Sequence, residues 1–321
     1  MTGLQNVMLL SAGRRVELAQ AIKADLVARL PNGKLIAADM RPQLSAACQV
    51  ADAAVALPRA TDPGYEASLL SSCREQRIAL VIPTIDTELV VLAQLRERFA
   101  AEGTVVVVSD ESLVRRCRDK RLTAQLFREL DIDTPKIYSR DALEFPCFAK
   151  PFDGSSSIGA VKVESRAMLS ESMLRDERMM FMELIDPSSR EYTVDIYYDR
   201  NGTLQCCVPR QRIETRAGEV SKGITRRNAV YDYLLPRLRR LQGARGCITL
   251  QLFYNEQSGS FAALEINPRF GGGFPLSYSA GAHYPGWLID EFLLEGTVAF
   301  NDGWERDLLM LRYDAKVLVR G

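Results

Sequence analysis

The stretch LEINPRFGGGFP, residues 264–275, carries the most information about the fold. Polar side chains occupy every second position of its first part: Glu265, Asn267 and Arg269. Side chains alternate between the two faces of a β-strand, so these groups project together while Leu264 and Ile266 enter the core. The glycines that follow allow the backbone to approach a ligand closely.

The strand TLQLFY precedes this stretch, and the turn NEQSGS joins the two. Antiparallel pairing about that turn places Gln251 opposite Glu265, and it places Thr249 opposite Asn267. Gln251 therefore joins the polar face at a Cβ–Cβ distance of roughly 4.5–5.5 Å. Such oxygen ligands suit Mg²⁺ that also holds phosphate, with Arg269 facing the charge on a transferred phosphoryl group. The alternative is a solvated sheet face with an ordinary Glu–Arg pair.

Size and composition fit a globular protein with a full core, since the chain has 321 residues and 47% are hydrophobic. Lys plus Arg and Asp plus Glu both total 41, so no net charge favours nucleic acid or an anionic membrane as partner. The sequence has no apolar run of the roughly 18–20 residues that a membrane helix needs, and no basic signal-peptide start. The seven cysteines show no CxxC spacing and indicate reduced, mostly buried thiols of a cytoplasmic protein.

The only histidine is His283, which narrows the chemistry. It excludes zinc sites with several histidines and two-histidine iron sites. A Ser-His-Asp hydrolase would need His283, and no GxSxG elbow accompanies it. Carboxylates and amides would have to hold any metal, which favours magnesium or manganese.

The order of predicted elements indicates two kinds of architecture. Apolar strands alternate with helices over residues 1–110, which predicts right-handed βαβ units and a parallel sheet. Residues 110–132 read as a helical pair or one interrupted helix. Short strands with hairpin turns follow Pro135, and 214–227 is the longest irregular stretch. Two further helices are expected at 228–244 and 284–296.

The segment FAKPFDGSSSIGAVKV, residues 148–163, reads as strand, loop, strand. Lys150 ends the first strand, and the loop offers backbone amides and hydroxyls that can wrap phosphates around a fixed positive charge. The alternative is a generic hairpin turn. The loop residues concerned are Gly154, Ser155, Ser156, Ser157 and Gly159.

The segment VPRQRIETRAGEVSKGIT follows the turn DRNG, so it pairs back along EYTVDIYY. Arg210, Arg212 and Arg216 share one face with Glu214, and aligned guanidiniums suit a substrate carboxylate or an acyl phosphate. An exposed strand of alternating charge is the alternative. Lys222 lies in an expected mobile loop that closes over the same site.

Two strand–helix junctions of the first domain are candidates for ligand contact. SAGRR contains Gly13 and Arg14, and backbone donors at such a junction can bind anions. PTIDTEL contains Asp86 and Glu88 near a helix start, where capping is the default explanation.

The sequence EINPRFGGG after an antiparallel pair, with a glutamine fourteen residues before its glutamate, resembles the metal-binding signature of the ATP-grasp superfamily. The resemblance is nearest to its carbamoyl-phosphate-synthase-like branch. It implies that Mg²⁺ (or Mn²⁺) is bound by Gln251, Glu265 and Asn267. It further implies that Arg269 contacts the transferred phosphate and that ATP is the nucleotide.

Other segments resemble the same superfamily in the same chain order. Lys150 would contact the α-phosphate and adenine side beneath a lid loop, and Lys120 would enter the same pocket, with Arg118 and Arg121 as competitors for that role. The segment 180–199 resembles the adenine hinge, so Glu191 would accept hydrogen bonds from ribose hydroxyls. The hinge backbone would be Met182, Glu183, Leu184 and Ile185. Because the first domain faces the nucleotide in this superfamily, its junctions would border the acceptor substrate: Gly13, Arg14 and Glu88.

The resemblance implies an α/β and α+β fold in three parts: a parallel-sheet domain (1–110), a helical linker with a lid subdomain (111–185), and an antiparallel α+β domain (186–321). It implies an ATP-dependent carboxylate–amine (or carboxylate–thiol) ligase acting through an acyl phosphate on small-molecule substrates, and a homodimer. The single short unit and the lack of extra histidines set the chain apart from carbamoyl phosphate synthase and biotin carboxylase. The alternatives are a kinase or carboxylating enzyme of the same fold, or a non-catalytic nucleotide-binding regulator.

Overall fold

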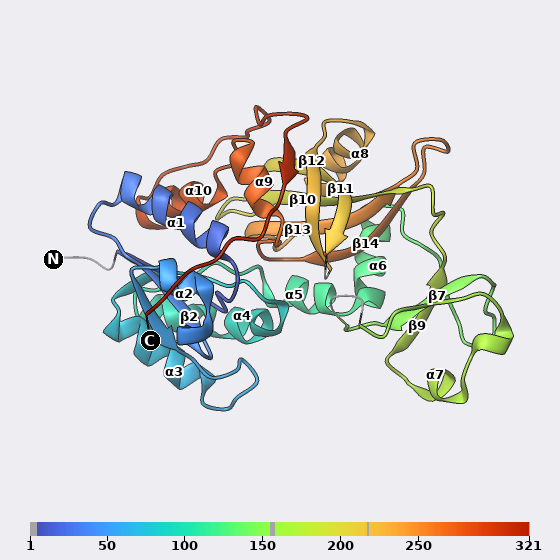
Figure 1. Ribbon diagram of the computed structural model, residues 1–321, viewed down its shortest axis with the longest axis horizontal. Helices are drawn as coiled ribbons and strands as arrows, with labels where there is room; N and C mark the ends of the chain where they lie inside the picture. The colour runs from blue at the N-terminus through green and yellow to red at the C-terminus, as the bar shows by residue number, and fades with distance from the viewer. Residues whose placement is uncertain (1–4, 155–157, 217, 321) are drawn as a thin grey trace.

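A computed structural model of the protein describes residues 5–154, 158–216 and 218–320 (Figure 1). Three β-sheets organise this part of the chain. None of the helices in these ranges is long and apolar enough to cross a membrane.

The first sheet has five parallel strands in the order β3-β2-β1-β4-β5, which confirms the predicted parallel sheet. Its strands are β1 (Asn6–Leu9), β2 (Leu35–Asp39), β3 (Ala53–Ala56), β4 (Ile78–Ile82) and β5 (Val105–Val106). Its helices are α1 (Val16–Arg29), α2 (Ala46–Val50), α3 (Tyr65–Glu75) and α4 (Asp86–Ala101). The strand order reverses next to β1, and the carboxyl ends of strands at such a point border a crevice.

A helical pair leads out of this domain. α5 (Glu111–Arg118) and α6 (Lys120–Glu129) are separated by Asp119, whose backbone is extended and whose side chain accepts a hydrogen bond from the Arg121 backbone N–H. Asp119 therefore ends one helix and caps the next, so the segment is not a single interrupted helix.

The second sheet is small and has four strands in the order β6-β9-β7-β8. They are β6 (Ile137–Tyr138), β7 (Cys147–Pro151), β8 (Val161–Val163) and β9 (Met179–Glu183), with the short helix α7 (Glu171–Arg175) beside them. Cys147, Ala149, Val163 and Phe181 form its own separate core. This subdomain projects from the rest of the molecule at the right of Figure 1.

The third sheet has six strands in the order β14-β13-β10-β11-β12-β15, all antiparallel. The strands are β10 (Arg190–Tyr198), β11 (Leu204–Arg216), β12 (Glu219–Thr225), β13 (Gly246–Tyr254), β14 (Phe261–Asn267) and β15 (Leu309–Leu311). The helices are α8 (Ala229–Leu238), α9 (Phe274–Ser279) and α10 (Tyr284–Leu293).

Two expectations about this region are wrong. The segment 214–227 is not irregular, because β11 continues to Arg216 and β12 pairs with it from Glu219 onward. The helix expected over 228–244 ends at Leu238, two residues after Pro236.

The β13–β14 hairpin has the predicted register, with Gln251 paired to Glu265 and Thr249 to Asn267. One register shift follows, because Leu252 pairs with Ala263 and leaves Leu264 as an extra residue. Such a bulge breaks the alternation of faces. The prediction that Leu264 enters the core is therefore wrong. Leu264 is half-buried and lines a cavity.

One hydrophobic core joins the first domain to the antiparallel sheet. It contains Leu9 of β1 and Leu26 of α1 together with Ile196 of β10 and Ile289 of α10. Helices α1 and α10 lie side by side at this junction (Figure 1). The two large bodies are thus held together by burial of apolar side chains, and the lid subdomain is attached to them with a core of its own.

Candidate active site

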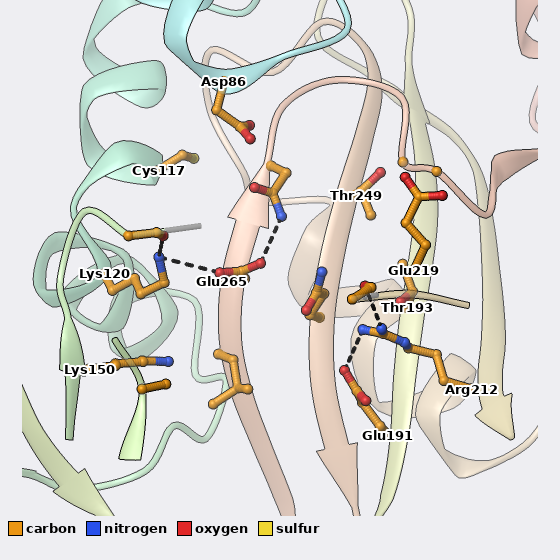
Figure 2. Close-up of a pocket in the computed structure, with 18 of the residues that line it drawn as sticks. Asp86, Cys117, Lys120, Lys150, Glu191, Thr193, Arg212, Glu219, Thr249 and Glu265 are labelled. Atoms are coloured by element: carbon orange, nitrogen blue, oxygen red, sulfur yellow. Dashed lines mark hydrogen bonds and ion pairs between the residues drawn. The ribbon is translucent and has the colours of Figure 1, made fainter. Parts of the chain in front are cut away.

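A cavity of about 820 Å³ lies between the first domain, the lid subdomain and the large antiparallel sheet. Its wall includes residues from the start of α4, from the lid strands β7 and β9, and from strands β10 to β14. Figure 2 shows that Lys120 and Lys150 reach it from the α6 and β7 side and face Glu265 of β14.

The floor of the cavity is one face of the large sheet. A row of mutually paired residues crosses four strands: Glu265, Gln251, Thr193 and Arg210. Residues paired across neighbouring strands point to the same face, and all of these line the cavity. The alternation seen in the sequence therefore does bring a polar surface together.

The Glu265 carboxylate lies at the centre of this surface. It accepts a hydrogen bond from Asn267 Nδ2 at 3.1 Å and forms an ion pair with Lys120 Nζ at 3.5 Å. Lys120 Nζ also donates to the Gly154 carbonyl at 2.5 Å, which connects α6 to the lid loop.

The residues around Glu265 fit a magnesium ion that retains phosphate or water ligands. No cluster of three or more His, Cys, Asp or Glu side chains suited to a metal occurs within the described ranges. A metal here would be held by one carboxylate, from Glu265, and by the amide oxygens of Gln251 and Asn267. Magnesium takes few protein ligands and keeps much of its shell as water or phosphate, so this donor set suits it.

Lys150 is placed at the end of β7, with its charge inside the cavity wall. Burial lowers the pKa of the Lys150 ammonium to about 8; Glu265 opposes the shift and Lys120 adds to it. A buried ammonium whose pKa is lowered gains stability when an anion arrives. Lys150 is therefore suited to bind a phosphate.

Arg269 connects the sheet to the first domain. Its Nη2 donates to Asp86 Oδ2 of α4 at 2.9 Å, and its Nη1 donates to the Phe270 carbonyl at 3.3 Å. Its Nε is buried and has no hydrogen-bond partner among the described residues. An unpaired buried donor is costly, and a phosphate oxygen would satisfy it.

Glu191 and Arg212 face each other across the floor (Figure 2). Arg212 Nη1 donates to Glu191 Oε1 at 2.5 Å, and its Nη2 donates to the Gly218 carbonyl at 3.0 Å. Burial raises the pKa of the Glu191 carboxyl, Arg212 opposes that shift and Glu265 adds to it. Both side chains thus lie in the cavity as predicted, but paired with each other.

Arg210 is fully buried, and its charge is neutralised within the protein. Its Nε and Nη2 donate to the two carboxylate oxygens of Asp195 at 2.7 and 3.1 Å. The Ser277 hydroxyl donates to the same carboxylate at 2.6 Å. Such a satisfied pair holds the sheet and α9 in one arrangement and leaves Arg210 little capacity to bind substrate.

The glycine run of the opening stretch lies directly against these side chains. A Cβ on Gly273 would come within 2.4 Å of Arg210 Nη1, and one on Gly271 within 3.1 Å of Thr249 Oγ1. A Cβ on Gly272 would lie 3.0 Å from Glu219 Oε1. None of the three has a positive φ, so the constraint on these positions is the space available to a side chain, and it is tightest at Gly273.

The predicted hinge residues line one end of the cavity. They are Met182, Glu183, Leu184 and Ile185, at the end of β9 and just beyond it. The apolar side chains of Phe148, Phe253 and Leu264 line the same cavity. Met180 is buried.

The lid loop is described only in part. Gly154 lines the cavity, whereas Gly159 does not; it has a φ of +75° and lies against Pro151. The predicted phosphate contacts Ser155, Ser156 and Ser157 lie outside the described residues.

Two predicted substrate residues lie outside the cavity. Arg216 forms an exposed ion pair with Asp314. Lys222 belongs to β12 and not to a mobile loop, and its Nζ lies 2.8 Å from Glu214 Oε1. The pairing of β11 with β12 shifts on both sides of Glu214, so the alternation that placed Arg216 beside Arg212 does not hold. Thr215 lines the cavity instead.

The first domain contributes a residue that we did not predict. Gly13 does not line the cavity and Arg14 is exposed, whereas Arg15 lines it and donates through Nη2 to the Thr84 carbonyl at 3.0 Å. Burial, and next the charge of Arg269, lower the pKa of Arg15 to about 10. The pair of arginines in SAGRR could have indicated that one of them lines the cavity. Which of the two does so depends on the angle at which α1 begins.

Glu88 is buried beneath the start of α4 and lines a second, smaller cavity. It accepts hydrogen bonds from the backbone N–H groups of Thr84 and Ile85 at 2.8 and 3.2 Å. The Ser11 hydroxyl donates to it at 2.8 Å. The capping contact that the sequence favoured is therefore present.

Two family models match the chain. One, described as the N-terminal domain of PylC-like proteins, matches residues 7–107. The other, described as ATP-grasp in the biosynthetic pathway with Ter operon, matches residues 175–308. No match was found among curated protein sequences.

Solved structures share the fold at low sequence identity. The biotin carboxylase domain of Hydrogenobacter thermophilus 2-oxoglutarate carboxylase, in complex with MgADP, ADP and bicarbonate, has a TM-score of 0.76 and 13% identity; the match covers 96% of this chain and 74% of that one. L-amino acid ligase from Bacillus licheniformis has a TM-score of 0.69 and 15% identity, covering 91% and 75%. Rhizobium etli pyruvate carboxylase has a TM-score of 0.73 and 13% identity, and the match covers 96% of this chain but only 30% of that one.

The chain has the ATP-grasp fold, and its residues 175–308 match an ATP-grasp family model. The solved structures that share this fold include ligases and carboxylases.

Proposed function

We propose that the protein is an ATP-dependent ligase that joins a small-molecule carboxylate to an amine through an acyl phosphate. The observation that carries this proposal is the common space shared by Glu265, Lys150 and Arg269 in the large cavity. A ligand carboxylate, a triphosphate and a divalent cation would all find complementary charges there.

The chain's residues divide into those that bind the nucleotide and those that handle its phosphates. The backbone from Met182 to Ile185 would bind the adenine edge, and Glu191 would accept from the ribose after leaving Arg212. Glu265, Gln251 and Asn267 would hold Mg²⁺, which supplies neutralisation of phosphate charge when bound. Lys150 and the lid loop, including Ser155 to Ser157, would contact the phosphates.

The reaction needs no nucleophile from the protein. A substrate carboxylate oxygen would form a bond to the γ-phosphorus as the bond to the β-bridging oxygen breaks and ADP leaves. Arg269 and Lys150 would stabilise the charge on the transferred group. The amine would then attack the acyl carbon, the carbon–oxygen bond to phosphate would break, and the amine proton would leave with phosphate or water.

Arginines at the first-domain side of the cavity favour an anionic substrate. Arg15 and Arg269 both line the cavity, and their mutual repulsion contributes to the lowered pKa of Arg15. A carboxylate placed between them would relieve that repulsion. Arg212 borders the same space, whereas Arg216 and Lys222 would have to break exposed ion pairs to reach it.

An ADP-release assay with panels of carboxylic acids and amines tests the proposal. We expect magnesium-dependent release of ADP and phosphate with formation of an amide, and loss of at least ~100-fold of the rate in Glu265→Gln. Glu256→Gln, at the exposed turn of the same hairpin, is the matched control and should keep full activity. Circular dichroism checks that both variants fold.

The products separate the alternatives. A stable phosphorylated substrate would indicate a kinase, and bicarbonate-dependent turnover would indicate a carboxylating enzyme. ATP binding without any ADP release across the panels would indicate a nucleotide-binding regulator and overturn the proposal.

The three-domain division, a homodimer and a cytoplasmic location remain predictions. Light scattering on the purified protein tests the homodimer, for which we expect a mass of about twice that of the 35.9 kDa chain.

A further inference from the structure

Amide formation needs a group that accepts a proton, because the attacking nitrogen loses one as the carbon–nitrogen bond forms. A positioned side chain that takes this proton speeds such a step by roughly 100- to 10,000-fold. The only histidine, His283, does not line the large cavity. Lys150 lines it, but a bound phosphate would favour the charged form of Lys150, which cannot accept a proton. The remaining candidates are the carboxylates of the described cavity wall: Asp86, Glu183, Asp186, Glu191, Glu219 and Glu265.

Most of these carboxylates already face a basic side chain of the cavity or the hinge. Three of them form ion pairs inside it: Glu265 with Lys120, Asp86 with Arg269, and Glu191 with Arg212. The hinge end, where the adenine would bind, contains Glu183 and Asp186. Glu219 is therefore the carboxylate of the described wall that is left for the second substrate.

Glu219 lies at the start of β12, beside the glycine run. Its Oε1 is 3.0 Å from the place that a Cβ on Gly272 would take. Its Oε2 accepts a hydrogen bond from Arg312 Nη1 at 3.3 Å. The Glu219 side chain is 46% exposed, so this pair is weak and the carboxylate can exchange protons with water.

The charge of Glu219 reaches the first-domain side of the cavity. Burial is the main cause of the lowered pKa of Arg15; Arg269 adds to it, and Glu219 opposes it more than Asp86 does. Glu219 therefore lies near the space between Arg15 and Arg269, where the proposed function places the substrate carboxylate. In Figure 2 it lies across the cavity from Lys120 and Lys150, on the side away from the lysines that would contact phosphate.

We propose that Glu219 receives the amine substrate in the large cavity and accepts its proton during amide formation. The carboxylate attracts the ammonium form of the amine, which loses one proton to solvent before it reacts. The nitrogen lone pair then forms the bond to the acyl carbon, and the carbon–oxygen bond breaks with its electron pair leaving on the phosphate. The second N–H proton passes to a Glu219 oxygen and from there to water.

This inference rests on the proposed ligase function, because it names the residue that acts on the amine. Hydroxylamine tests it, since this nucleophile is largely neutral at neutral pH and attacks acyl phosphates without the help of a base. Its product, a hydroxamate, therefore reports formation of the acyl phosphate alone. The amide formed with the amine substrate reports the complete reaction.

The experiment measures both products with the acid that supports ADP release. We expect Glu219→Gln to form hydroxamate within about threefold of the wild-type rate and to lose roughly 100-fold or more of the rate of amide formation. Glu214→Gln is the matched control on the neighbouring strand. Glu214 is an exposed carboxylate that does not line the cavity, so its variant should keep both rates.

The two products also distinguish the outcomes. An equal loss of hydroxamate and amide in Glu219→Gln would make Glu219 a structural residue and overturn the assignment, as would an unchanged rate of amide formation. Wild-type protein that forms neither product with any acid would overturn the ligase function itself, and the assignment with it.

Discussion

At the scale of single residues, the site depends on groups that are buried before their ligands arrive. Burial disfavours the charged form of Lys150, and the nearby Lys120 adds to this effect. Glu265 offsets only part of it. Arg269 keeps a buried Nε without a partner. Arg269 lies close enough to Arg15 for its charge to add to the effect of burial in lowering the pKa of Arg15. An anion would relieve all three conditions, so we expect this cavity to bind a triphosphate better than an uncharged ligand.

Nucleotide binding should therefore take up a proton at Lys150. The pKa of its ammonium is about 8 without ligand, so the group is about half neutral at pH 8. Phosphate oxygens favour the charged form and raise that pKa. We expect an uptake of up to roughly half a proton per ATP at pH 8, falling toward zero at pH 6.5, where the group is already protonated.

Calorimetric titration in two buffers of different ionisation enthalpy measures this uptake. Lys150→Arg keeps the charge at every pH used and should bind ATP without the pH 8 uptake. An unchanged uptake in that variant would assign the proton to a group other than Lys150.

At the scale of elements, the hairpin β13–β14 and its glycine run position the floor of the cavity. Gly273 packs against Arg210 and Val220, and a Cβ there would meet the valine Cγ1 at 2.6 Å. Its φ of −95° is open to any residue, so the cost of a substitution is steric.

Gly273→Ala should destabilise the protein by about 1–3 kcal/mol, because Arg210 is held by Asp195 and cannot move away freely. Gly272→Ala is the matched control: its Cβ would touch only the carboxylate end of Glu219, which is exposed and able to turn aside. Urea unfolding of both variants measures the difference. Equal losses of stability would show that the two glycines are needed for another reason.

The same elements show what the sequence could predict. The register of β13 with β14 follows from alternation and from a short turn, so Gln251 and Glu265 meet as expected. The bulge at Leu264 adds one residue without altering the pattern of residue types, and nothing local marks it. The sequence did not predict β12 because its charged residues have low strand propensity. Pairing with β11 and β15 holds this segment in a strand.

At the scale of the whole molecule, the cavity is assembled from segments far apart in the chain. Arg269 meets Asp86 across 183 positions, and Arg15 approaches both. A single sequence shows that each residue is polar and lies near the end of an element, but only the packing of α1 on α10 brings the first domain to the floor of the cavity. That Lys120, Lys150, Glu191 and the hinge residues share one cavity could be predicted because they follow a motif order, and their role in nucleotide binding stays a prediction. Which residues line the cavity on the first-domain side could not be predicted, because no motif marks them.

Because the first domain, the lid subdomain and the antiparallel sheet all contribute residues to the cavity, nucleotide should stabilise the molecule as a whole. A ligand that binds only the folded state at about 100 times its Kd adds roughly 2.7 kcal/mol. For a chain of 321 residues that corresponds to a rise in Tm of roughly 3–5 °C. The core that joins the first domain to the large sheet predicts that both bodies unfold together.

Thermal unfolding with MgADP, with ADP and EDTA, and without ligand measures the effect. We expect the full rise only with magnesium, and we expect Glu265→Gln to show the smaller EDTA value under both conditions, because Glu265, Gln251 and Asn267 are the residues proposed to hold the metal. Glu256→Gln on the same hairpin should behave as wild type. A rise that is equal with and without magnesium would remove the metal from this site while leaving the nucleotide in it, since Lys150 and the hinge residues would then suffice for binding.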